Sequence, residues 1–148
     1  MAASSERSDP GVHVAAADLL SRAAYALDER EDAMLSACFS HDAVFSLRVA
    51  GGELVGPFTG REAIMGLMRS AWESQTDQRR HLVSNIFYPG DATPTVSGAI
   101  VVISYLTLMA TEAGDSRLLS AGVYRDELTA GAEGWQISRR HLDLDKAY

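Results

Sequence analysis

The sequence predicts an α+β fold, in which helices pack on one face of a curved, mostly antiparallel sheet. Two observations predict it. Up to about residue 74, apolar residues mostly recur at helical spacing. Beyond that point, segments with β-strand character are separated by short turns rich in glycine, proline and aspartate. Strands joined by short turns pair antiparallel, and helices that precede a run of strands are typical of the α+β class.

The first two helices are predicted from apolar periodicity and from the polar residues at their ends. One runs from Val14 to about Asp28 and carries an apolar stripe that includes Leu20. A short helix over residues 33–39 follows a polar break, and Asp32 is its expected N-cap. These two segments should therefore form a pair of helices at the start of the domain.

A third helix is predicted from Thr59 to about Ser74. Its start, Thr59-Gly60-Arg61-Glu62, matches a capping box, in which a threonine and a glutamate satisfy free backbone N–H groups. The residues expected along its apolar side are Ile64, Met65, Met68, Ala71 and Trp72. This face should pack against the sheet.

Six segments have β-strand character. They are residues 43–49, 53–55, 79–89, 96–111, 117–129 and 134–144. The pair Gly51-Gly52 supplies a turn between the first two segments. Residues 101–109 are apolar on both faces, which favours a central strand.

Composition sets limits on the class of protein. The chain has 148 residues, and we expect a mobile tail over 1–12 and one domain over 13–148. A net charge of −7 and a pI near 5.0 argue against nucleic-acid binding. No apolar stretch is long enough to cross a membrane.

Because the single cysteine, Cys38, forms no internal disulfide, a cytoplasmic location fits. We expect no metal and no cofactor, since neither zinc spacing nor a phosphate loop is present.

The most informative stretch is the predicted strand that contains His81. Alternate side chains of a strand share a face, so His81, Val83, Asn85 and Phe87 should point the same way. A histidine among apolar neighbours is either a core residue with a hydrogen-bond partner or a base at the bottom of a pocket. For His81 taken alone, the core interpretation is favoured.

Several stretches occur in an order that resembles one protein family. They are Tyr25 to Asp32, Phe39 to Phe45, Gly56 to Ile64, Arg80 to Asn85 and Gly134 to Ile137. On these residues the chain resembles the SnoaL-like group of the nuclear transport factor two superfamily, over roughly residues 15–144. The resemblance implies a cone-shaped, cystatin-like roll, in which a bent sheet and three helices enclose an apolar pocket that opens at one end.

The resemblance also implies a pair of site residues. Scytalone dehydratase, the lindane dehydrochlorinase and bile acid dehydratase share an aspartate at the end of the first helix and a histidine on the strand after the third. Asp28 and His81 fall on these positions. The chain departs from scytalone dehydratase in two ways, because Leu27 replaces a tyrosine and residues 117–120 contain no histidine. A simpler dyad with one histidine remains.

The expected chemistry is that of a cofactor-independent lyase or isomerase, of the dehydratase or cyclase type. His81 would remove a proton beside a carbonyl, and Asp28 would orient its ring. The ligand would be a small, apolar, cyclic molecule that resembles a polyketide, a steroid or an aromatic compound. The expected substrate contacts are Tyr25, Asn85, Tyr105 and either Arg139 or Arg140. The two arginines face opposite sides of their strand, and the sequence leaves the choice between them open.

Two other functions stay open at this point. One is a non-catalytic subunit, because small subunits of ring-hydroxylating dioxygenases share this fold. The other is a ligand-binding module, which would be favoured if Asp28 lay out of hydrogen-bond reach of His81. Apolar residues on both faces of 100–109 and 118–123 further predict a homodimer or a homotrimer that associates through the outer face of the sheet.

Overall fold

The computed structural model describes residues 10–90 and 98–148. Its helices are α2 (Pro10–Asp28), α3 (Asp32–Cys38) and α4 (Arg61–Ser74). Its strands are β1 (Phe39–Val49), β2 (Val55–Thr59), β3 (Gln78–Phe87), β4 (Ile100–Glu112), β5 (Asp115–Gly131) and β6 (Gly134–Leu144). The α+β class is confirmed.

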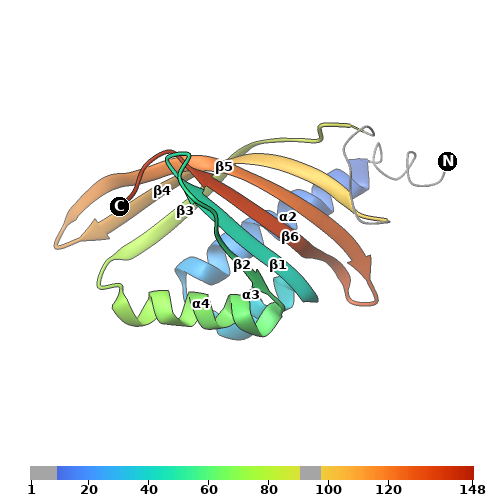
Figure 1. Ribbon diagram of the computed structural model, residues 1–148, viewed down its shortest axis with the longest axis horizontal. Helices are drawn as coiled ribbons and strands as arrows, with labels where there is room; N and C mark the ends of the chain where they lie inside the picture. The colour runs from blue at the N-terminus through green and yellow to red at the C-terminus, as the bar shows by residue number, and fades with distance from the viewer. Residues whose placement is uncertain (1–9, 91–97) are drawn as a thin grey trace.

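One sheet of six strands, in the order β2-β1-β6-β5-β4-β3, forms the frame of the molecule. All neighbours pair antiparallel except β1 and β6, which run parallel. The apolar strand β4 lies between two neighbours, and β3 is an edge strand. The sheet curves over the helices, so its concave face is covered and no helix lies on its convex face within the described residues (Figure 1).

The core lies between the concave face and the helices. α2 contributes Leu20, α4 contributes Ile64 and Met65, and the sheet contributes Leu106 and Leu128, all of them fully or nearly fully buried. The helical members come from the apolar stripes that the helical spacing predicts, because a helix with one apolar face is stable only when that face leaves water.

The helix starts differ from the prediction at three points. Thr59 is not a cap: it pairs with Val44 as the last residue of β2, and Gly60 is the N-cap of α4. Asp32 lies inside the first turn of α3 and binds Arg69, with Oδ2 2.6 Å from Nε. Pro10 begins α2, so residues 10–12 belong to a helix and not to the expected tail. Residues 1–9, and 96–97 of the predicted fourth strand, lie outside the described residues.

A tertiary bond explains why the capping box fails. The backbone N–H of Gly60 donates to the carbonyl of Ala43 on β1 at 2.7 Å, which holds the strand-to-helix junction against the sheet. Gly60 has φ 93, a left-handed conformation that glycine adopts without a steric penalty. Thr59 therefore stays in the sheet ladder, and its side chain cannot cap the helix.

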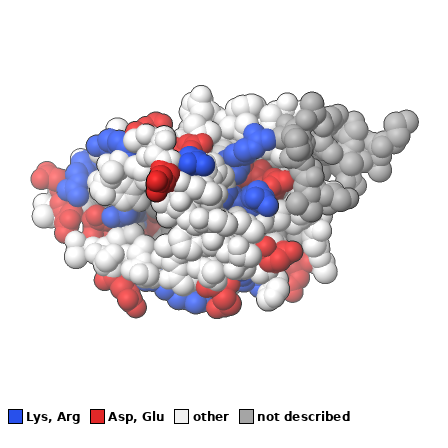
Figure 2. Space-filling view, in the orientation of Figure 1, with Lys and Arg blue, Asp and Glu red and all other residues white. Residues whose placement is uncertain are grey.

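Two observations concern the expectations that the protein binds no nucleic acid and does not cross a membrane. On the face drawn in Figure 2, acidic and basic side chains of the described residues are interspersed and form no continuous basic stripe. Within the described part of the chain, no helix is long and apolar enough to cross a membrane. The cytoplasmic location stays a prediction.

Two glycine substitutions test the register of the sheet. In Gly122→Ala, the new methyl group would overlap the backbone oxygen of Asp143, so β5 and β6 must move apart. We expect a loss of about 1–3 kcal/mol in the free energy of unfolding, measured with urea. Gly66→Ala is the control: it meets nothing within 4 Å on the exposed side of α4. The free energy of unfolding of Gly66→Ala should rise by about 0.5–1 kcal/mol. Equal stability of the two variants would contradict this register.

Candidate active site

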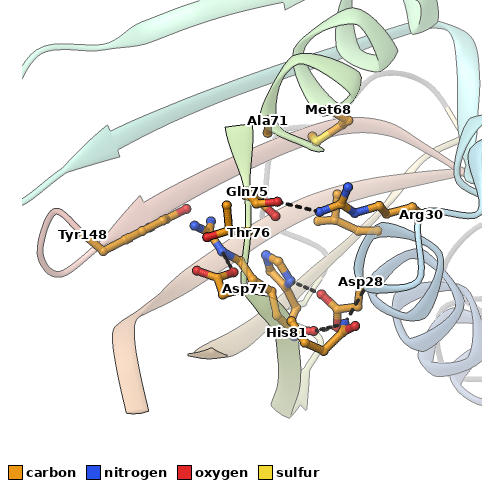
Figure 3. Close-up of a pocket in the computed structure, with 12 residues that line it drawn as sticks. Asp28, Arg30, Met68, Ala71, Gln75, Thr76, Asp77, His81 and Tyr148 are labelled. Atoms are coloured by element: carbon orange, nitrogen blue, oxygen red, sulfur yellow. Dashed lines mark hydrogen bonds and ion pairs between the residues drawn. The ribbon is translucent and has the colours of Figure 1, made fainter. Parts of the chain in front are cut away.

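Asp28 and His81 form a hydrogen-bonded pair between the helices and the sheet (Figure 3). Asp28 is the last residue of α2, and His81 lies on the edge strand β3. One carboxylate oxygen of Asp28 lies 2.5 Å from His81 Nδ1, and the other accepts the backbone N–H of His81 at 2.8 Å. The side chains are only 5% and 13% exposed. The carboxylate accepts at Nδ1, so a neutral ring carries its lone pair on Nε2.

Two further hydrogen bonds fix the end of the helix that carries Asp28. Trp72 Nε1 on α4 donates to the carbonyl of Leu27 at 2.9 Å, and Gln78 Nε2 donates to the carbonyl of Asp28 at 3.1 Å. The last carbonyls of a helix lack partners within the helix, so these bonds satisfy groups that would otherwise need water. The position of the carboxylate is therefore set by α4 and β3 together.

His81 lines two spaces that share several wall residues, besides a shallow depression described below. We call the first the inner cavity: about 210 Å³ under the concave face, lined mainly by apolar side chains such as Phe39, Phe45, Leu67, Val83, Leu142 and Leu144. We call the second the mouth: about 370 Å³, lined by Arg30, Gln75, Thr76, Asp77 and Arg79 among others. Both are lined by Leu27, Met68, Ala71, His81 and Tyr148. The imidazole therefore lies where the apolar space meets the polar opening.

Charged groups in the mouth are already paired or bonded. Arg79 Nε lies 3.0 Å from a carboxylate oxygen of Asp77, and its guanidinium lies 5.0 Å from the centre of the Tyr148 ring. Arg30 donates to the backbone carbonyl of Gln75 at 3.0 Å (Figure 3). These contacts tie the α4–β3 connection to the end of α2 and to the C-terminal segment.

Besides His81, the wall of the inner cavity includes the guanidinium of Arg140. Arg140 of β6 forms a two-point ion pair with Asp126 of β5: Nε to Oδ1 is 2.7 Å and Nη2 to Oδ2 is 3.0 Å. Asp126 is completely buried and Arg140 is 7% exposed. Burial acts to lower the pKa of the guanidinium, but the adjacent Asp126 carboxylate raises it further, so it stays charged. Its Cζ lies 4.0 Å from the centre of the Tyr124 ring, and burial raises the pKa of Tyr124 to about 12.

The sheet register decides between the two candidate arginines. Arg140 faces the concave side and lines the inner cavity. Arg139 faces the convex side, where its Nε lies 3.0 Å from a carboxylate oxygen of Glu127, and its side chain is 57% exposed. Only Arg140 can therefore contact a ligand in the inner cavity.

Asn85 and Tyr105 do not join the site. They line a separate groove of about 400 Å³ on the convex face, with Ser84 and Thr107. The alternation along β3 fails because Asn85 has φ 54 and the register with β4 shifts between Ser84 and Phe87. This bulge turns Asn85 away from the face that His81 occupies, so the expected shared face is wrong and Asn85 does not line the inner cavity. Tyr105 pairs with Ser84 on the convex side and is 49% exposed.

Tyr25 lies beside the dyad but outside both spaces. It is 55% exposed and borders a shallow depression between α2 and β3, with Asp28, Arg80 and His81. Its position three residues before Asp28 does place it on the same side of the helix. The ring nevertheless reaches the outer side of the pair, so Tyr25 does not line the inner cavity or the mouth.

Asp126, Tyr124 and Tyr148 were missed from the sequence. A signal was present for Asp126, because an acidic residue in a strand with Val123, Tyr124 and Leu128 needs a partner once it is buried. That partner is 14 residues away, and only the pairing of β5 with β6 identifies it. Within residues 10–90 and 98–148, no group of three or more histidine, cysteine or acidic side chains is placed to hold a metal ion.

Comparisons with known proteins agree with this architecture. A model of the SnoaL-like domain matches residues 13–141. A search of curated protein sequences finds no match. Aln2 from a Streptomyces species is similar in structure (TM-score 0.75, 24% identity, 93% of each chain covered). So is a protein of unknown function with a cystatin-like fold from Nostoc punctiforme (TM-score 0.74, 17% identity, 93% of each chain).

A predicted beta subunit of an aromatic-ring-hydroxylating dioxygenase from Novosphingobium aromaticivorans is a further structural neighbour. It has a TM-score of 0.73 and 14% identity, with 91% of this chain and 90% of that chain covered. At these identities the likenesses show the fold alone. That fold is cystatin-like, as the sequence predicts.

The buried ion pair generates a stability prediction. Arg140→Met leaves the Asp126 carboxylate buried without a partner, and we expect the free energy of unfolding to fall by about 3–5 kcal/mol. The double variant Asp126→Leu/Arg140→Met removes both charges and should recover most of that loss. Urea denaturation measures both. A single variant as stable as the unaltered protein would show that the pair is not buried in solution.

Proposed function

The chain belongs to the SnoaL-like domain family, and from the geometry of its site we propose that it is a cofactor-independent lyase or isomerase of the dehydratase or cyclase type. The observation that carries the proposal is the Asp28–His81 pair at the junction of the inner cavity and the mouth. Family membership alone does not determine an activity, because one fold hosts many functions. The chemistry of the pair therefore has to carry the argument.

In this proposal His81 Nε2 is the general base. Its ring is held at Nδ1 by the carboxylate, and no hydrogen bond to Nε2 comes from any described residue. Nε2 takes a proton from the carbon beside a carbonyl, and the Asp28 carboxylate stabilises the imidazolium that forms. The resulting enolate either expels hydroxide from the next carbon, which leaves as water after the imidazolium returns the proton, or is reprotonated elsewhere. Base catalysis of this kind contributes about 10²–10⁴-fold.

Arg140 is the proposed contact for the substrate oxygen. It lines the inner cavity with His81, and its guanidinium lies in a site lined mostly by apolar side chains. A fixed N–H donor in such a site stabilises negative charge that develops on a carbonyl oxygen, and it needs no rearrangement during the reaction. His81 and Arg140 then have separate roles, one on the proton and one on the oxygen.

The dimensions and lining of the site indicate the substrate class. The inner cavity, at about 210 Å³, is smaller than the roughly 300–1,000 Å³ of most ligand pockets. A single apolar ring therefore fits the inner cavity, and polar parts of a larger molecule would extend into the mouth. We propose a small, largely apolar cyclic carbonyl compound, of polyketide, steroid or aromatic type.

The non-catalytic alternative rests on the structural likeness to a dioxygenase beta subunit. Such a subunit needs no base, whereas this chain has an aligned carboxylate–imidazole pair beside a cavity. Co-purification with an iron-bearing partner would favour the subunit. The ligand-binding module loses its main support, because Asp28 and His81 are within hydrogen-bond distance.

Association of identical copies through the convex face is a further part of the proposal. This face carries Leu82, Tyr105 and Leu118, which are 49%, 49% and 55% exposed. Contiguous exposed apolar surface on a soluble protein is typical of an interface. A homodimer and a homotrimer both remain compatible with it.

Replacement of the base is the direct test of activity. We expect the unaltered protein to accelerate exchange of the α-hydrogens of 2-tetralone with deuterated water, followed by NMR. His81→Ala should lose about 10²–10⁴-fold of this acceleration. Asp28→Asn, which disturbs the ring orientation, should lose at least about tenfold.

A second histidine provides the matched control. His141 is also hydrogen-bonded to an aspartate, with Nε2 3.1 Å from Asp143, but it lies on the convex face. His141→Ala should therefore leave the exchange rate unchanged. Exchange that survives in His81→Ala, or that the unaltered protein does not accelerate, would contradict the proposed base.

Association is tested by a charge placed on the convex face. Leu82→Glu and Tyr105→Glu should each convert the assembly to monomers in sedimentation velocity, because a charge at the centre of an interface must lose its hydration. Val14→Glu, on the 71% exposed position of α2, is the control and should leave the assembly intact. An unaltered protein that sediments as a monomer would refute this interface.

A further inference from the structure

Asp126 takes no part in the proposed proton transfer, yet it is the most deeply buried acidic side chain among the described residues, with no exposed surface. It lies directly opposite Arg140 in the pairing of β5 with β6. Both of its carboxylate oxygens accept hydrogen bonds from that arginine, at 2.7 and 3.0 Å. A carboxylate is costly to bury, so its place beside the cavity needs an explanation.

The two members of the pair are placed differently toward the inner cavity. Arg140 lines the cavity, whereas Asp126 does not. Arg140 uses Nε and Nη2 on Asp126, and no described residue accepts a hydrogen bond from Nη1. The carboxylate therefore lies behind the guanidinium, and Nη1 remains as an N–H donor for whatever occupies the cavity.

This arrangement cancels the charge of the arginine without removing its hydrogen-bonding capacity. A two-point pair between guanidinium and carboxylate is neutral as a unit, and its planar geometry prevents the guanidinium from turning. The ring of Tyr124, 4.0 Å from Cζ, confines it from another side. At the other end of the cavity, Asp28 adds a negative charge whenever the His81 ring is neutral. An anionic ligand group at the Arg140 end would thus meet no net positive charge.

We propose that Asp126 is a positioning residue that determines which ligand group the inner end of the cavity accepts. It holds Arg140 so that the guanidinium binds a neutral carbonyl or hydroxyl oxygen and discriminates against a carboxylate or phosphate at the same place. The proposal rests on the proposed function only in taking the inner cavity as the ligand site. It concerns ligand binding, so it can be tested without turnover.

Two ligands of the same shape separate the effects of charge and size. Acetophenone carries a neutral carbonyl where benzoate carries a carboxylate, and neither contains a leaving group. Their dissociation constants are measured by ligand-observed NMR titration at neutral pH. In Asp126→Asn the charge of Arg140 is no longer cancelled, so the ratio of the two constants should shift toward benzoate by at least about tenfold.

The neighbouring register position supplies a matched control. Glu127 pairs with Arg139 on the convex face, in the same strand pair and one residue further along. Glu127→Gln removes one carboxylate from the same strand but leaves the cavity intact, so the ligand ratio should not change. If Asp126→Asn also leaves the ratio unchanged, Asp126 serves only to join β5 and β6 and the proposal is wrong.

A second variant covers the case in which Asp126→Asn does not fold. Asp126→Asn/Arg140→Gln replaces the ion pair by two neutral amides that can bond to each other, so the net charge of the inner end stays at zero. The ligand ratio should then stay within about threefold of the unaltered value, since electrostatic discrimination depends on net charge. A shift toward acetophenone of about tenfold would instead mean that Arg140 attracts benzoate even while it is paired with Asp126, and it would overturn the proposal.

These measurements distinguish the two claims. If the protein does not accelerate deuterium exchange but its ligand ratio still depends on Asp126, His81 is not the base and the proposed role of Asp126 stands. If exchange is accelerated but the ligand ratio does not depend on Asp126, only the proposed role of Asp126 is refuted.

Discussion

The carboxylate of Asp28 meets two N–H groups of one residue, the ring and the backbone of His81, and this contact joins the two layers of the molecule. On the edge strand β3, the backbone N–H of His81 has no partner in another strand of the described residues. The last residue of α2 satisfies it, and in doing so it sets the distance between the helix end and the sheet. The same carboxylate orients the imidazole. The Asp28 carboxylate therefore both joins α2 to β3 and orients the imidazole of the site.

Two pairs, each made of a carboxylate and a basic side chain, border the inner cavity and differ in kind. At one end Asp28 holds a ring whose charge depends on its proton. At the other end Asp126 holds a guanidinium whose charge is permanent. In both pairs the acid is the more buried member and the basic group lines the cavity. This common arrangement presents hydrogen-bonding nitrogen atoms to a ligand and keeps the acidic oxygens behind them.

Much of the architecture follows from local sequence. Apolar spacing predicted all three described helices, and turn residues separated the strands, because these signals depend on neighbours within a few positions. Asp28 and His81 were identified through their place in a family pattern, and the structure brings them together. The wrong predictions, on the face of Asn85 and on the capping box, come from backbone geometry that residue spacing does not show. A bulge at Asn85 reversed the expected face, and a backbone bond from Gly60 to Ala43 displaced the capping box.

The sequence by itself determined the fold class, the order of helices and strands, and the two residues of the proposed dyad. The tertiary structure alone decided which arginine enters the cavity, because Arg139 and Arg140 differ only in the face that the β5–β6 register gives them. It alone paired Asp126 with Arg140 and placed Tyr105 on the outer surface. The physical reason is the sequence separation of the residues involved. Periodicity depends on residues a few positions apart, whereas a pair across two strands forms only when the sheet brings distant residues together.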